Sequence, residues 1–118
     1  MTKIAYNACY GGFSLSRAAV IRGREISGDP KWAGCTLKGE MYDDGSGPAT
    51  DDYGHLDYNH PRTDPVLVQV IEELGRKADG MCAKLAIAKV PNGKKYRIDE
   101  YDGIESVMKQ DDYEWQTA

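Results

Sequence analysis

The stretch DPVLVQVIEELG, residues 64–75, is the clearest structural signal in the sequence. Asp64 is a typical helix N-cap, and Pro65 suits the first helical position. The apolar residues that follow recur at the spacing of one stripe along a helix, and they are Leu67, Val70, Ile71 and Leu74. We therefore predict a helix that begins after Asp64 and ends at Gly75 or Gly80.

The residues that follow this helix favour strands. Three runs, 82–90, 95–101 and 104–108, have strand-like composition, and they are separated by a PNG turn at 91–93 and by the dipeptide DG at 102–103. Such short turns join neighbouring antiparallel strands, so we predict a three-stranded meander in the C-terminal half.

The N-terminal residues predict one further strand and one further helix. Residues 3–10 alternate between two faces, as a strand requires. Two glycines then interrupt the pattern, and Ser14 and Ser16 offer hydroxyl N-caps to a helix that begins near Arg17. This helix is short and is expected to end near Gly23 or Gly28.

Together these elements predict an α+β fold. It has a mostly antiparallel sheet of about four strands with two helices on one face. The 118 residues are close to the commonest domain size, so residues 1–118 are expected to form a single domain. Residues 28–63 are rich in Gly and Pro, and seven acidic residues lie between Glu40 and Asp64, which predicts a long irregular acidic loop that packs partly on the domain.

The composition excludes several classes of function. The chain has 15 Lys and Arg against 19 Asp and Glu, a formal net charge of -4, which gives no field to hold nucleic acid as a partner. No apolar run is long enough to span a bilayer, so we expect no membrane partner and a cytoplasmic protein. Cys9, Cys35 and Cys82 lack the spacing of a zinc site and are odd in number, which predicts reduced thiols.

The junction between the first strand and the first helix is the most suggestive local feature. Backbone N–H groups at a helix start, approached through glycines, favour an anion, while hydroxyls, arginines and an aromatic ring could complete a ligand site. The predicted ligand-binding residues are Gly11, Gly12, Phe13, Ser14, Ser16, Arg17 and Arg62. The motif is neither a Walker loop nor a dinucleotide fingerprint, and a tight turn followed by serine caps is the more ordinary explanation of it.

Other polar clusters give weaker signals. His55 and His60 lie among aspartates, but a glycine-rich loop does not fix their geometry, so we predict a solvated loop and no metal or other cofactor. Asp99 and Glu100 point to opposite faces of a strand and cannot form an acid and base pair. No complete catalytic signature is present, so a binding protein is favoured over an enzyme.

Three blocks of the sequence resemble a small protein family common in tailed bacteriophages. They are YNACYGGFSLS at 6–16, RTDPVLVQVIEELG at 62–75 and YRIDEYDGIESV at 96–107, which together cover about a third of the chain. The resemblance implies no particular activity or catalytic residue. What it implies is context, namely an accessory viral protein in the host cytoplasm that binds a host protein or removes a nucleotide signal of antiphage defence.

Three functional hypotheses follow. The leading one is a protein that binds and sequesters a small phosphorylated or nucleotide-like ligand. One alternative is an inhibitor that presents the acidic loop between Glu40 and Asp64 to a host protein, and another is a metal-dependent nucleotide hydrolase that uses His55 and His60. We also expect a homo-oligomer, although no residue pattern indicates its interface.

Overall fold

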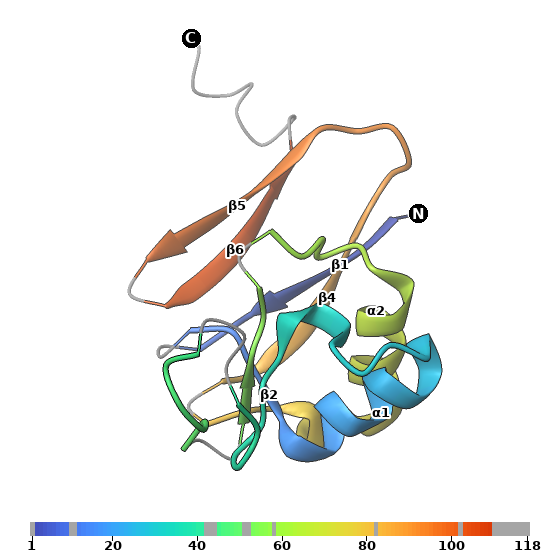
Figure 1. Cartoon of the computed structure of the whole chain (residues 1–118). Coiled ribbons are helices and arrows are strands. Elements are labelled where there is room, and N and C mark those ends of the chain that lie inside the picture. The colour runs from blue at the N-terminus through green and yellow to red at the C-terminus, as the bar shows by residue number, and fades with distance from the viewer. Residues whose placement is uncertain are drawn as a thin grey trace, which may run out of the picture.

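The structure is a computed structural model that describes residues 2–9, 12–41, 45–50, 53–57, 59–81, 83–101 and 103–109. Within these ranges the chain forms an α+β fold of two α-helices and six strands (Figure 1). In chain order they are β1 (Thr2–Asn7), β2 (Ser14–Ser16), α1 (Arg17–Ser27), β3 (Tyr53–His55), α2 (Pro65–Leu74), β4 (Leu85–Val90), β5 (Tyr96–Tyr101) and β6 (Ile104–Lys109). Two short 3-10 turns, Trp32–Gly34 and Gly75–Ala78, complete the regular structure.

Helix α1 begins and ends at the local signals that the sequence contains. The Ser16 hydroxyl accepts a hydrogen bond from the Ala19 N–H at 3.2 Å, which satisfies a donor that the first helical turn leaves open. Gly28 follows the last turn with φ 71°, a left-handed conformation that glycine adopts without strain. Of the two predicted ends, Gly28 is therefore the correct one.

Helix α2 is capped as predicted. The Asp64 carboxylate accepts from the Val66 N–H at 2.9 Å, Pro65 is the first helical residue, and the helix ends at Gly75. Its apolar stripe is buried, and Leu67 is fully inaccessible to solvent. This stripe packs against α1 and against β1 and β4 to form the core.

The segment that follows α1 contributes directly to the core. Trp32, Cys35 and Leu37 are all buried, and burial raises the pKa of the Cys35 thiol to about 12. The Trp32 ring lies on Gly23 of α1, where an added Cβ would stand 2.1 Å from the ring. Gly23 is thus required by the close approach of the indole to the helix backbone.

The strand pairing differs from the predicted meander. Strand β4 pairs antiparallel with β1, from Thr2 opposite Val90 to Asn7 opposite Leu85, and does not pair with β5. Strands β5 and β6 form a separate hairpin, and β2 pairs with β3 over three residues. The described sheets are two-stranded, so the predicted four-stranded sheet is wrong in its connectivity.

Strand β6 nevertheless lies beside β1, with β5 on the outer side of the hairpin (Figure 1). The two strand pairs are therefore neighbours that lack a shared backbone ladder. The side chains that lie between them form the candidate site described below. Among the described helices, none is both long and apolar enough to cross a membrane.

Candidate functional site

A cavity of about 450 Å³ lies where the β5–β6 hairpin meets the rest of the chain. Its apolar lining comes from Phe13, Leu56 and Ile98, each on a different segment. The backbone of Gly12 and of Gly103 closes two of its sides. We call it the Phe13 cavity. Its volume falls within the range of small-molecule sites.

The charged side chains of the Phe13 cavity are mostly acidic. Arg62 is the one basic side chain in the lining, and Asp57, Glu100 and Glu105 are the acidic ones. Glu100 also accepts a hydrogen bond from the Gly103 N–H at 2.9 Å, across the tip of the hairpin. The cavity is therefore net negative and favours hydrogen-bond donors or cations over anions.

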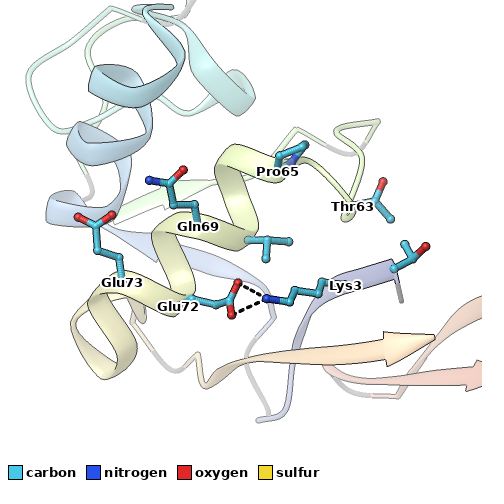
Figure 2. A pocket seen from close by; sticks show the side chains of 8 residues that line it. Lys3, Thr63, Pro65, Gln69, Glu72 and Glu73 are labelled. Carbon is cyan, nitrogen blue, oxygen red and sulfur yellow. Dashed lines mark hydrogen bonds and ion pairs between the residues drawn. The ribbon is translucent and has the colours of Figure 1, made fainter. Parts of the chain in front are cut away.

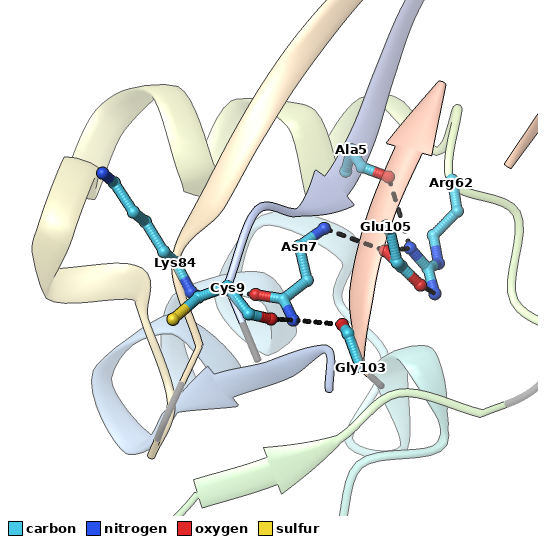
Figure 3. A network of polar contacts seen from close by, with 7 residues as sticks. All are labelled: Ala5, Asn7, Cys9, Arg62, Lys84, Gly103 and Glu105. Atoms are coloured by element: carbon cyan, nitrogen blue, oxygen red, sulfur yellow. Dashed lines mark hydrogen bonds and ion pairs between the residues drawn. The ribbon is translucent and has the colours of Figure 1, made fainter. Parts of the chain in front are cut away.

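Arg62 is held in place on three sides. Its guanidinium makes two parallel hydrogen bonds to the Glu105 carboxylate, at 2.6 and 2.8 Å, and Nη1 lies 3.4 Å from the Ala5 carbonyl (Figure 3). Its Cζ stands 4.2 Å from the centre of the Phe13 ring. Such a planar, paired and stacked arginine is rigid.

The same pair closes the free edge of β1. The Ala5 N–H donates to the Arg62 carbonyl at 2.9 Å, and the Asn7 N–H donates to Glu105 Oε1 at 2.8 Å. These are the positions at which a third strand would have bonded. Arg62 and Glu105 thus explain why β6 lies beside β1 without pairing to it.

Asn7 joins β1 to two other segments. Its side chain is fully buried, its Nδ2 donates to the carbonyls of Cys9 and Gly103, and its Oδ1 accepts from the Lys84 N–H at 2.9 Å (Figure 3). The nitrogen and the oxygen of this buried amide therefore both have partners, which is how a buried polar group avoids a large desolvation cost.

The structure brings together only some of the predicted ligand-binding residues. Gly12, Phe13 and Arg62 line the Phe13 cavity, whereas Gly11 lies outside the described residues. Ser14 is buried and donates to the Met81 carbonyl at 3.3 Å, away from the cavity lining.

Ser16 and Arg17 also lie elsewhere. The Ser16 hydroxyl donates to the Lys77 carbonyl at 2.5 Å and caps α1, so its hydrogen-bonding capacity is used within the fold. Arg17 is exposed at the first position of α1. The predicted anion cradle is therefore not assembled around the serines.

The loop histidines have structural partners. His60 lies 2.7 Å from the Asp64 carboxylate and meets the Trp32 ring edge to face, and Trp32 Nε1 donates to the same carboxylate at 3.0 Å. These hydrogen bonds together outweigh burial and lower the pKa of Asp64. His55 contacts the Tyr53 ring. No set of three potential metal ligands occurs in the described ranges.

Four of the acidic residues that the inhibitor hypothesis invoked lie outside the described residues. They are Asp43, Asp44, Asp51 and Asp52. Glu40, by contrast, is engaged in the fold, because its carboxylate accepts two hydrogen bonds from Arg24, at 2.8 and 2.9 Å, and one from the Leu37 N–H.

A second hollow, of about 670 Å³, lies between α2 and the first residues of β1 (Figure 2). Lys3 and Glu72 cross it as an ion pair at 2.9 Å, and Glu73 is paired with Arg22 of α1. Both pairs are about 40% exposed. The charged side chains of this hollow are thus already in ion pairs, and none of the predicted ligand-binding residues lines the hollow.

Six residues that line the Phe13 cavity were not among the predicted ligand-binding residues, and neither was the neighbouring Asn7. The six are Leu56, Asp57, Ile98, Glu100, Gly103 and Glu105. Asn7 could have been noticed, because it is a polar residue between the small apolar residues Ala5 and Cys9 on one strand face. Glu105 carries no such signal, since an acidic residue in a short strand is ordinary on a solvent face. Only its contact with Arg62, 43 positions away in sequence, marks it.

No protein-family model matches the chain, and neither a curated protein nor a solved structure is detectably similar to it.

Proposed function

We propose that the protein binds a small nucleotide-like ligand in the Phe13 cavity and holds it without transforming it. The observation that supports this is the convergence of Gly12, Phe13 and Arg62, predicted as ligand-binding residues from the sequence, on one cavity of suitable size. The cavity combines apolar walls with a few directed polar groups, as small-molecule sites generally do.

The charge of the lining indicates how such a ligand would lie. A phosphate at Arg62 would have to displace Glu105 and would stand close to two further carboxylates. A nucleobase would make favourable contacts instead. Its ring can pack between the apolar side chains, and its N–H groups can donate to Asp57 or Glu100. We therefore place the base in the cavity and any phosphate at its mouth.

In the tailed-phage context that the sequence resemblance implies, a binding protein of this kind would act in the host cytoplasm. It would lower the free concentration of a nucleotide signal used in antiphage defence. Capture without turnover needs no catalytic group.

The test is thermal unfolding of the purified protein with nucleosides, the matching nucleotides, and inorganic phosphate. A ligand that binds only the native state, at about 100 times its Kd, adds about 2.7 kcal/mol and raises Tm by on the order of 10 °C. We expect a nucleoside and its nucleotide to give similar shifts, and phosphate alone to give none.

Two charge variants sharpen this test. Glu100→Gln keeps the shape of the cavity but removes an acceptor charge, so it should weaken binding on the order of tenfold. Glu72→Gln, in the hollow beside α2, is the matched control and should leave binding unchanged. Tighter binding in Glu100→Gln would mean that an anion occupies the cavity, and no shift with any nucleoside or nucleotide would refute the proposal.

A further inference from the structure

Strands β4 and β5 each have an outer edge to which no described strand is paired. The edge of β1 is closed by Arg62 and Glu105, and β4 has its first N–H, that of Leu85, bonded to Asp79 Oδ1 at 2.9 Å. Strand β5 pairs with β6 on one side and has no described strand on the other (Figure 1). An unpaired edge of six residues is a template for another strand.

The register of the hairpin defines which groups this edge presents. Tyr101 pairs with Ile104 across a two-residue connection, and that position is a hydrogen-bonded pair in a tight hairpin. Because bonded and non-bonded pairs alternate, Tyr96, Ile98 and Glu100 direct their N–H and C=O groups away from β6. The edge therefore offers three complete sets of backbone donors and acceptors.

The basic and the acidic residues of β5 lie in different halves of the strand. Basic residues, Lys95 and Arg97, precede Ile98, and acidic residues, Asp99 and Glu100, follow it. If a second β5 lies antiparallel with Ile98 opposite Ile98, each Arg97 faces an Asp99 and each Glu100 faces a Tyr96. Any parallel pairing in register would instead place like charges side by side.

We infer that β5 is the interface of a two-fold symmetric homodimer, in which two β5 strands pair antiparallel about Ile98. The two hairpins then form one continuous four-stranded antiparallel sheet. A two-stranded hairpin alone is marginally stable, and the pairing supplies the strands that it lacks. The contact is isologous, as in most homodimers.

This dimer would also extend the Phe13 cavity. Ile98 and Glu100 line the cavity and lie on the same face of β5. In the antiparallel register, Tyr96 of the partner subunit stands opposite Glu100 on that face, at the rim of the cavity. Tyr96 is 40% exposed in the single chain, so it is accessible for this contact.

Charged side chains on an edge strand can also serve to prevent pairing with other strands. The observation that favours pairing here is the order of the charges along β5, because that order makes two antiparallel copies complementary. Within one chain Arg97 and Asp99 already form an exposed ion pair at 2.9 Å. A test must therefore separate the contact between chains from the contact within a chain. Mixing two variants achieves this.

The experiment is sedimentation and native mass spectrometry of the wild type and three variants. We expect the wild type to be a dimer at tens of micromolar, and Arg97→Asp and Asp99→Arg each to raise the dimer Kd on the order of tenfold. An equimolar mixture of these variants should form the heterodimer in preference to either homodimer, since each acidic strand then faces a basic one. Lys38→Glu, on an exposed loop, is the control.

Three outcomes would overturn the inference. They are a wild type that is monomeric at several hundred micromolar, an Arg97→Asp variant that dimerises like the wild type, or a mixture without preferred heterodimers. Far-ultraviolet circular dichroism shows whether each variant is folded. None of these readouts involves a ligand, so the dimer can fail while the proposed binding function stands.

Discussion

The helical half and the hairpin half of this protein differ in how completely their side chains are buried. In the helical half, α1, α2 and the Trp32 segment enclose side chains with almost no exposure. In the β5–β6 hairpin, none of the described side chains from Tyr96 to Met108 is fully buried. A region that is closed supports the fold, and a region that is left open is available for contacts with ligands or with other chains.

The largest expected effect comes from the aromatic residues of the two halves. Trp32 is 4% exposed and Tyr101 is 77% exposed. Trp32→Ala leaves a cavity against Gly23 and removes the hydrogen bond from the indole N–H to Asp64. This variant should lose about 4 kcal/mol in the free energy of unfolding. Tyr101→Ala should change it by less than about 0.5 kcal/mol.

Urea denaturation of both variants measures this difference. Equal losses of stability would mean that the hairpin is as tightly packed as the helical half, contrary to the comparison.

The next effect concerns the ion pair that joins the two halves. The Glu105 side chain is 10% exposed and Arg62 is 22% exposed, so Glu105→Ala leaves a largely buried guanidinium without its partner and the Asn7 N–H without an acceptor. We expect a loss of about 3 kcal/mol. Glu72→Ala breaks the exposed pair with Lys3 and should cost below about 1 kcal/mol.

Chemical denaturation at low and high salt separates these two pairs. The Glu72 effect should shrink at high salt because its pair is exposed, and the Glu105 effect should persist. A salt-sensitive Glu105 effect would show that the pair is solvated in solution.

The smallest effect is a dependence on pH that belongs to the helical half. The Arg24 guanidinium, together with the Leu37 N–H, lowers the pKa of Glu40 from 4.5 to about 2. The folded state thus favours the ionised form, so this contribution to stability is complete above about pH 4.5 and is lost as the pH falls toward 2.

Denaturation midpoints measured from pH 5 to pH 2 test this. Glu40→Gln should be less stable than the wild type at pH 5, and the difference should narrow at acid pH. A constant difference across this range would exclude the Arg24 contact as its cause.

The sequence predicted what is decided locally and missed what is decided at a distance. Both helices were found because Ser16, Asp64 and the terminal glycines act within one turn of the residues they cap. The pairing of β4 was wrong because its partner, β1, lies at the other end of the chain, while a short turn suggested the nearer β5. Local patterns carry no information about which of two possible strands is the partner.

The candidate site was also predicted only in part from the sequence. Phe13 and Arg62 were identified by residue type, and the cavity does bring them together. Their acidic surroundings were not foreseen, because Glu105 reaches Arg62 only through the tertiary placement of the hairpin. The sign of the charge in the cavity, and hence the part of a ligand that it would hold, therefore required the structure.

The pairing of β1 with β4 also has a consequence for synthesis on the ribosome. Ala5 and its neighbours are made many residues before the strand that they pair with, Leu85–Val90. At ordinary rates of translation the first strand waits several seconds, with its apolar face exposed, before its partner is available. Folding of the β1–β4 pair should accordingly be completed only after β4 is made, and β1 is the segment that a chaperone would need to shield.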